Sequence, residues 1–184
     1  ESGSDRDNYF SRAQMYGCVL SGGLAGHVHG TGAYDVTSAA EPPGARPYFW
    51  QALRYESAEY MRGLGTFILS EGPRYRDLQL ASDDLSPRKA TGSSETGLDG
   101  WSFLMRTPDK GLGLLYFENK AQRGRTTGWR PNGRYRFTWF DPRVGDWRDS
   151  IELGSDEAGV MQLPPFPGGQ DVAGTDWAAK ILMR

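Results

Sequence analysis

Two histidines lie two residues apart between glycines, in Gly26-His27-Val28-His29-Gly30. In a β-strand, side chains at that spacing project from one face about 7 Å apart. The two imidazoles can therefore line a ligand pocket or hold a metal ion, or they can be ordinary hydrogen-bonded groups at a strand end. A metal site would need Asp35 or Glu41 as a further ligand, because the chain has no third histidine. We predict a pocket with no metal and no cofactor.

A basic stretch lies between Glu118 and Asp141, with no acid inside it. Its members are Lys120, Arg123, Arg125, Arg130, Arg134 and Arg136. Basic residues with interleaved aromatic rings can bind single-stranded nucleic acid. However, Arg134 and Arg136 alternate with apolar residues, which is typical of the solvent face of a strand. We therefore predict no nucleic-acid partner and favour contact with an anionic glycan. Trp129, in a turn-like segment, is the best candidate for an exposed ring that stacks on a sugar.

Composition narrows the functional classes further. The chain has 184 residues, a net charge of −2 and a single cysteine, Cys18, which excludes an intrachain disulfide. No apolar run approaches the roughly 20 residues of a membrane-spanning helix, and we predict no membrane partner. The sequence begins at Glu1 rather than at Met. We expect a processed product or a piece of a longer protein.

The chain divides into two parts of different periodicity. Apolar residues recur at spacings of three and four over 5–22 and 48–70, which predicts two helices with a short strand at 24–29 between them. The polar segment 82–97 is predicted to be a linker. The domain boundaries that follow are 1–81, a helix–strand–helix unit, and 98–184.

The second part alternates with a period of two. Short strands are predicted at 101–106, 112–118, 133–140, 147–153, 160–163 and 176–183. Turn signals such as Pro131-Asn-Gly separate them, so we expect an antiparallel β-sandwich.

Several segments together resemble the apiosidase-like glycoside hydrolases. The segment from Arg12 to Gly30 is similar to the family's last-strand region, where a helix ends in Leu-Ser-Gly and leads into Gly-His-x-Tyr-Gly. This chain has His29 where the family usually has Tyr. The segment that begins Trp50-Gln-Ala-Leu53 is similar to the family's final barrel helix. Trp139-Phe-Asp-Pro-Arg143 resembles a turn of the small β domain that follows the barrel and carries the name collagen-binding domain.

This resemblance implies a fold and an activity. Residues 1–81 would be the last α/β elements of a (β/α)8 barrel, and a complete barrel needs about 250 residues, so an N-terminal barrel segment is expected to be missing. The activity would be hydrolysis of O-glycosidic bonds in a plant or algal polysaccharide by a secreted or periplasmic enzyme. Hydrolysis needs two carboxylates, of which this chain would carry only one, so it would be inactive alone.

The resemblance also assigns residues. Glu1 would fall just after the seventh barrel strand and act as the catalytic nucleophile. His27 and His29 would lie at the mouth of the eighth strand, where they bind sugar hydroxyls or orient Glu1. Tyr34, Trp50 and Trp129 complete the expected substrate-binding set.

Two rival hypotheses remain open at this stage. The chain could be a non-catalytic module whose β-sandwich binds carbohydrate or protein. It could also be a structural domain that caps a barrel. No feature of the sequence selects a collagen triple helix as a ligand.

Overall fold

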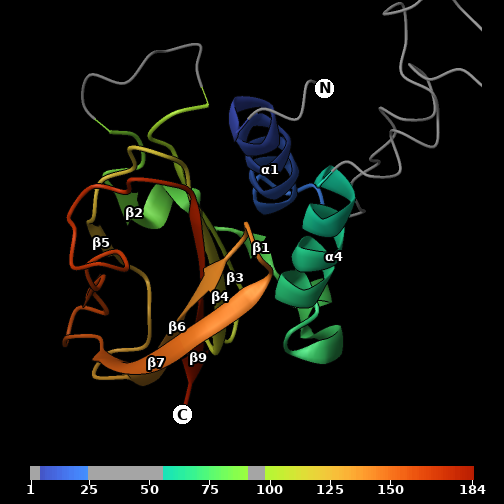
Figure 1. Cartoon of the computed structure of the whole chain (residues 1–184). Helices are drawn as coiled ribbons and strands as arrows, with labels where there is room; N and C mark the ends of the chain where they lie inside the picture. The colour runs from blue at the N-terminus through green and yellow to red at the C-terminus, as the bar shows by residue number, and fades with distance from the viewer. Residues whose placement is uncertain (1–4, 25–55, 91–97) are drawn as a thin grey trace, which may run out of the picture.

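Two helices lie side by side against one face of a six-stranded sheet, and a three-stranded sheet lies on its other side (Figure 1). This computed structural model describes residues 5–24, 56–90 and 98–184. The predicted strand at 24–29 and the first part of the predicted second helix lie outside the described residues. The fold class is a mixed α and β structure whose sheets are antiparallel, in agreement with the predicted β-sandwich.

The first helix, α1 (Asp5–Leu20), confirms the predicted spacing. Ala13, Tyr16 and Leu20 recur at three- and four-residue intervals, and all three are buried. The helix ends where Gly22 adopts a φ of 108°, which a residue without a Cβ reaches at little cost. The amide of Gly23 then donates to the carbonyl of Cys18 over 3.1 Å and satisfies one of the last carbonyls of the helix.

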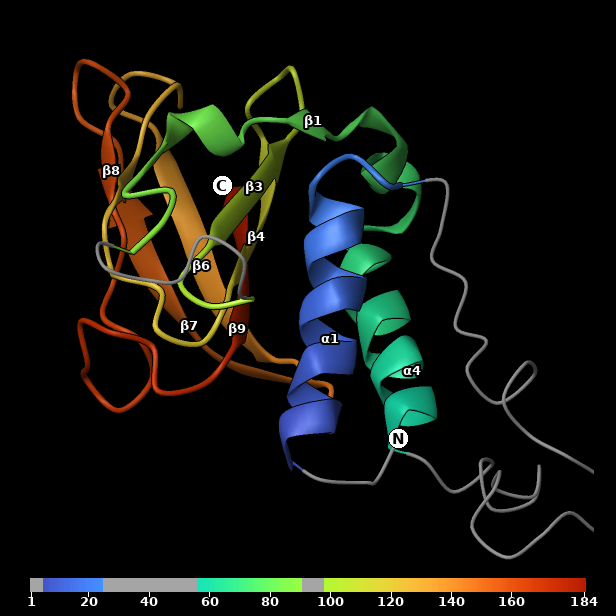
Figure 2. The ribbon, with the colours of Figure 1, turned by 90° about the horizontal axis from the view of Figure 1, so that it is seen from above.

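The second helix, α4 (Ser57–Ile68), runs beside α1 with its N-terminal end at the same end of the pair (Figure 2). Tyr60, Leu64 and Phe67 form its buried face. A 3₁₀ helix, η1 (Gly72–Asp77), follows it and leads the chain to the sheet. No helix of the described ranges has both the length and the apolar character of a membrane span.

The larger sheet has the strand order β1-β3-β4-β9-β6-β7. Its members are β1 (Gln79–Leu80), β3 (Ser102–Arg106), β4 (Leu112–Phe117), β6 (Arg134–Asp141), β7 (Asp146–Gly154) and β9 (Trp177–Met183). The period of two predicted the five longer strands to within a residue at each end. The C-terminal strand β9 lies between β4 and β6, so distant parts of the sequence meet at the centre of the sheet.

The smaller sheet has the order β2-β5-β8, with β2 (Leu85–Ser86), β5 (Arg125–Thr126) and β8 (Met161–Gln162). The predicted linker at 82–97 is wrong over its first part, because the 3₁₀ turn η2 (Ser82–Asp84) and β2 belong to the β structure. Leu85 is buried in the core, and the Ser82 hydroxyl accepts a hydrogen bond from the Leu104 amide at 3.0 Å. Residues 91–97 lie outside the described residues.

The larger sheet supports two apolar cores, one on each face. Between the sheets, Phe117, Trp139 and Phe166 pack with ring centroids 5.4–5.6 Å apart. On the helix side, Phe67 of α4 packs on Phe140 at 5.3 Å. The helices and the sheet are therefore joined by a shared core.

Candidate functional site

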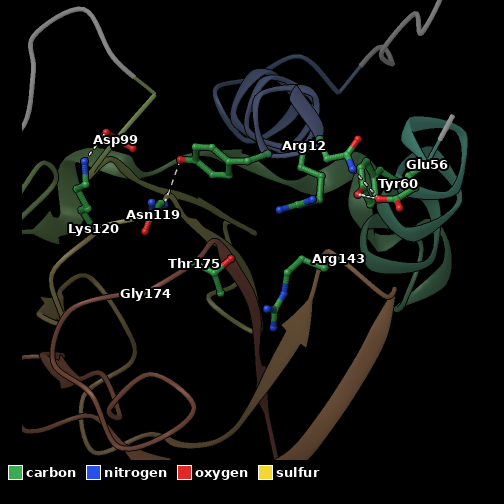
Figure 3. Close-up of a pocket in the computed structure, with 11 residues that line it drawn as sticks. Arg12, Glu56, Tyr60, Asp99, Asn119, Lys120, Arg143, Gly174 and Thr175 are labelled. Carbon is green, nitrogen blue, oxygen red and sulfur yellow. Dashed lines mark hydrogen bonds and ion pairs between the residues drawn. The ribbon is translucent and has the colours of Figure 1, made fainter. Parts of the chain in front are cut away.

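A cleft of about 610 Å³ opens where the N-terminal ends of both helices meet the loops at one end of the larger sheet (Figure 3). Its lining residues come from α1, from α4 and the residue before it, and from four loops: Asn8, Tyr9, Arg12, Glu56, Tyr60, Asp99, Asn119, Lys120, Arg143, Gly174 and Thr175. Charges of both signs, amides and hydroxyls face one another across it.

The strand register explains why these loops converge. Phe117 at the end of β4 pairs with Trp177 at the start of β9, and Phe140 near the end of β6 pairs with Ala178. The residues just after β4, just after β6 and just before β9 must therefore lie at the same end of the sheet. This end supplies the cleft residues that follow Phe117, such as Asn119, and those that precede Trp177, such as Thr175.

A buried ion pair between Arg12 and Asp176 fixes α1 to β9 at the base of the cleft. The Arg12 Nε and Nη2 atoms donate to the two carboxylate oxygens over 3.1 and 2.9 Å. The hydroxyls of Tyr116 and Thr175 each donate to one oxygen of the same carboxylate at 3.2 Å. Burial lowers the pKa of the Arg12 guanidinium, but the hydrogen bonds and charge of Asp176 outweigh burial and raise that pKa above its ordinary value.

Arg12 also links α1 to α4. Its guanidinium lies 4.7 Å from the centroid of the Tyr60 ring, a cation–π contact. The Tyr60 hydroxyl and the Asn8 amide each donate to Oε2 of Glu56 at 2.7 Å (Figure 3). Burial, followed by the hydrogen bond to Glu56, raises the pKa of Tyr60 to about 12, so its hydroxyl remains a donor at neutral pH.

A second charged cluster lies behind the Arg143 side of the cleft. Asp141 is buried and accepts hydrogen bonds from Arg143 Nε at 2.8 Å and Arg148 Nη2 at 2.7 Å. Burial raises the pKa of the Asp141 carboxyl, but these hydrogen bonds outweigh it and hold the pKa below its ordinary value. Both guanidiniums lie over the ring of Trp177, at 5.2 and 5.7 Å. The segment from Trp139 to Arg143 therefore contributes one aromatic ring to the apolar core between the sheets and two residues to the charged cluster.

The opposite wall of the cleft depends on Tyr9. Its hydroxyl donates to the Leu98 carbonyl and accepts a hydrogen bond from the Asn119 amide at 3.1 Å. Beside it, Lys120 Nζ lies 2.8 Å from Asp99 Oδ2. Burial, with the nearby charge of Glu118, raises the pKa of Tyr9 above its ordinary value.

Glu118 is a buried carboxyl directly behind this wall. Only 1% of its surface is exposed, and its Oε2 accepts a hydrogen bond from the Trp101 amide at 3.1 Å. Desolvation raises the pKa of Glu118 to about 7, helped by the charges of Asp99 and Asp176, although the Trp101 bond and Lys89 oppose the shift. The side chain therefore changes its charge near neutral pH.

This shift predicts a pH-dependent stability. The pKa of Glu118 in the folded state is higher than in the unfolded chain, so the folded state binds more protons between pH 4.5 and about 7. The free energy of unfolding should fall as the pH rises through that window, by up to about 3 kcal/mol. A Glu118→Gln variant keeps the hydrogen-bond acceptor without the charge, so its stability relative to the wild type should rise by that amount between pH 4.5 and 8.

Urea unfolding at the two pH values measures this effect. Glu157→Gln is the matched control, because Glu157 is exposed. If Glu118→Gln and wild type differ equally at pH 4.5 and 8, the pKa of Glu118 does not contribute to stability.

Most of the predicted site residues cannot be placed. Glu1, His27, His29, Tyr34 and Trp50 lie outside the described residues. Among the described residues, no group of three or more potential ligands gathers in a metal-binding arrangement.

The prediction for Trp129 is wrong. It is 1% exposed and packs edge-on against Tyr135, with ring centroids 5.1 Å apart. Gly113 makes room for it, because a Cβ there would lie 2.5 Å from the Trp129 ring. The turn that carries Trp129 is folded over the sandwich, so its ring is part of the core and offers no face to a sugar.

Sequence reasoning missed the residues that build the cleft. Arg12 appeared only at the start of a resembling segment, and Asp176 only at the start of a predicted strand. Glu56 and Glu118 were not singled out as site residues. One signal was present, since Arg12 lies beside the apolar positions of its helix and a buried arginine needs an acidic partner. Its partner is 164 positions away, and no local pattern identifies it.

The cleft is suited to a hydroxyl-rich ligand. Glu56 and Asp99 offer acceptors, Lys120 and Arg143 offer donors, and Asn119 offers both. Tyr60 is only 4% exposed, and its face is occupied by Arg12, so binding at this ring would depend on hydrogen bonds rather than on stacking.

Comparisons with known proteins concern the fold. No family model and no curated protein matches the chain. A solved structure described as a glycoside hydrolase matches with a TM-score of 0.69 and 15% identity, over 95% of this chain and 36% of its own. A glycoside hydrolase family 5 structure from Bacteroides vulgatus matches with a TM-score of 0.66 and 16% identity, over 95% and 35%. The chain therefore spans about a third of the length of these glycoside hydrolases and shares the fold of that part of them.

Proposed function

We propose that this chain is the portion of a glycoside hydrolase that joins the last helices of a (β/α)8 barrel to a β-sandwich domain. The observation that carries the proposal is the fold shared with two glycoside hydrolases over 95% of the chain, helices and sandwich together. The enzyme would be apiosidase-like, secreted or periplasmic, and would act on a plant or algal polysaccharide.

The orientation of the helices supports a barrel origin. The Asn8–Glu56 hydrogen bond joins the N-terminal ends of α1 and α4, so these two helices run in parallel (Figure 2). Parallel neighbouring helices need a long crossing connection, and 36 residues separate Leu20 from Ser57. In a (β/α)8 barrel, that connection contains the strand between two helices.

The position of the cleft supports a role in substrate binding. In such barrels the loops that lead into the helices lie on the active-site face. The cleft opens at the helix N-terminal ends, next to where that face would be. We assign Glu56, Asp99 and Arg143 to hydrogen bonds with sugar hydroxyls at the far end of the substrate groove.

The proposed chemistry uses two carboxylates. Glu1 would attack the anomeric carbon, and an acid from an earlier barrel strand would protonate the leaving oxygen. His27 and His29 would bind sugar hydroxyls or orient Glu1, while Tyr34 and Trp50 would line the groove.

Sequencing of the DNA upstream of the Glu1 codon is the first test. The proposal requires a reading frame that continues for about 250 residues, with alternating strands and helices and a second carboxylate. A start codon or a secretion signal immediately upstream would overturn it.

The longer protein then allows a direct test of Glu1. We expect Glu1→Gln to abolish release of reducing sugar from a panel of plant and algal polysaccharides without lowering the melting temperature. Glu157→Gln, an exposed site of the same chemistry, should leave turnover unchanged. Near-normal turnover by Glu1→Gln would refute the assignment of the nucleophile.

A further inference from the structure

In the fold, some basic residues of the stretch between Glu118 and Asp141 have hydrogen-bond or ion-pair partners and others do not. Lys120 pairs with Asp99 and Arg123 pairs with Asp171, while Arg130 donates to the Asp109 carbonyl. Arg125, Arg134 and Arg136 are exposed, and no described residue forms an ion pair with any of them. Arg134 and Arg136 lie together on β6, whereas Arg125 lies on β5.

These two arginines lie on an open part of the larger sheet. Tyr135 between them points into the core, so both arginines project from the opposite face, about 7 Å apart. The helices cover this face elsewhere, since α1 contacts β3 and β4, and Phe67 of α4 packs on Phe140 at the cleft end. The end of β6 that carries Arg134 is the end farthest from the cleft.

Neighbouring strands add polar groups to the same face. Arg184 lies across from Arg134, whose carbonyl accepts its amide at 3.1 Å. Glu152 lies across from Arg136 in the register of β7, and its carboxylate is bound by Arg184. Thr138 follows Arg136 on this face, and its hydroxyl lies 2.9 Å from that of Ser150 on β7. Thr138 is itself buried, so the exposed strip along β6 consists of the three arginines with Glu152 and Ser150.

The charge balance of this strip favours an anionic ligand. Among the described side chains of this strip, three arginines share the one carboxylate of Glu152, and like charges directly opposite on neighbouring strands are unfavourable without a counter-charge. A planar guanidinium binds a carboxylate or sulfate through two parallel hydrogen bonds. The nearby rings Trp129 and Tyr135 are buried, so the strip lacks the exposed rings on which nucleic-acid bases stack.

We propose that Arg134, Arg136 and Arg184 form a binding strip for an acidic polysaccharide, separate from the cleft. The choice of a polysaccharide over other polyanions rests on the proposed function, whereas the existence of the site rests on the strip itself. Bound there, a glycan chain carrying uronate or sulfate groups would lie along β6, with its hydroxyls near the exposed Ser150. The strip would hold the protein on its polymer while the cleft end remains free.

Affinity electrophoresis and titration calorimetry with the 184-residue chain test this proposal. The probes are polygalacturonate, a sulfated galactan, a neutral galactan and oligo-dT. We expect binding to at least one acidic glycan at 50 mM salt that weakens at 500 mM, because salt screens exposed charges. The neutral galactan should not bind.

A double variant and a matched control locate the site. Arg134→Gln/Arg136→Gln should raise the dissociation constant for the acidic glycan by about tenfold or more. Arg62→Gln/Arg125→Gln removes the same charge from exposed positions on α4 and β5 and should bind as the wild type does. Equal loss in both variants, no binding to any acidic glycan, or binding of oligo-dT as tight as that of the glycan would overturn the proposal.

This test is independent of the test of the proposed function. If the chain binds no acidic glycan but a long reading frame lies upstream, the proposed binding strip is refuted and the hydrolase proposal stands. If the chain binds an acidic glycan at the strip but no barrel sequence lies upstream, the chain is a binding module and the hydrolase proposal is refuted.

Discussion

Replacing Arg12 with methionine is expected to lower the free energy of unfolding by about 3–5 kcal/mol. Asp176 is 0% exposed, and Arg12 is its only cationic partner among the described residues. The substitution therefore leaves a buried carboxylate whose remaining partners are hydroxyl groups, which cannot offset the loss of solvation. Because the pair joins α1 to β9, the same change should weaken the base of the cleft.

Chemical denaturation of single and double variants measures this effect. Asp176→Asn alone should also destabilise, because it leaves Arg12 without a counter-charge. The double variant Arg12→Met/Asp176→Asn removes both charges and should recover part of the loss. Arg62→Met is the matched control, since Arg62 pairs with Glu59 on the exposed surface of α4 and such pairs contribute about 0–1 kcal/mol. A loss for Arg12→Met no larger than that for Arg62→Met would contradict the prediction.

Replacing Trp129 with alanine is expected to cost about 3–5 kcal/mol of unfolding free energy. The ring is fully buried, contacts Tyr135 edge-on and lies 5.1 Å below the Arg106 guanidinium. The turn that carries it is tightly fitted, because Gly159 has a φ of 74° and a Cβ there would lie 2.4 Å from the Trp129 carbonyl oxygen. Removal of the ring would leave a cavity that this backbone cannot easily close.

A phenylalanine variant separates a core role from a sugar-binding role. The Trp129 Nε1 atom is buried without a hydrogen-bond partner in the described structure, so Trp129→Phe loses no hydrogen bond and should cost less than Trp129→Ala. Glycan binding should be unchanged in Trp129→Phe. A Trp129→Ala variant that is as stable as the wild type but loses glycan binding would contradict the core role and show that Trp129 stacks on the sugar.

The two helices and the larger sheet are joined by the shared core on the helix side of the sheet. Phe67 on α4 contacts Phe140 and Trp147 on the sheet, and Tyr16 on α1 stacks on Tyr116 of β4 at 5.2 Å. The helices and the larger sheet therefore share one apolar core. The cleft lies at one end of the larger sheet and the arginine strip at the other.

Local sequence patterns were sufficient to predict most of the regular elements. Alternation over 134–141 and 177–183 and the three- and four-residue spacing of Ala13, Tyr16 and Leu20 predicted structure that was confirmed. These patterns succeed because each reports which side of one element is apolar, and that property is local. The two-residue strands β1, β2 and β5 were not predicted, because they are too short to show a period.

Which faces meet depends on the packing of distant elements and could not be predicted from local patterns. The local sequence around Trp129 is typical of an exposed turn, yet the sandwich closes over it. Arg12 and Asp176 form a pair across 164 positions because β9 inserts between β4 and β6 and brings Asp176 beneath α1. Burial and charge pairing depend on contacts between distant elements, and the packing of those elements, rather than any spacing along the chain, determines which side chains form a site.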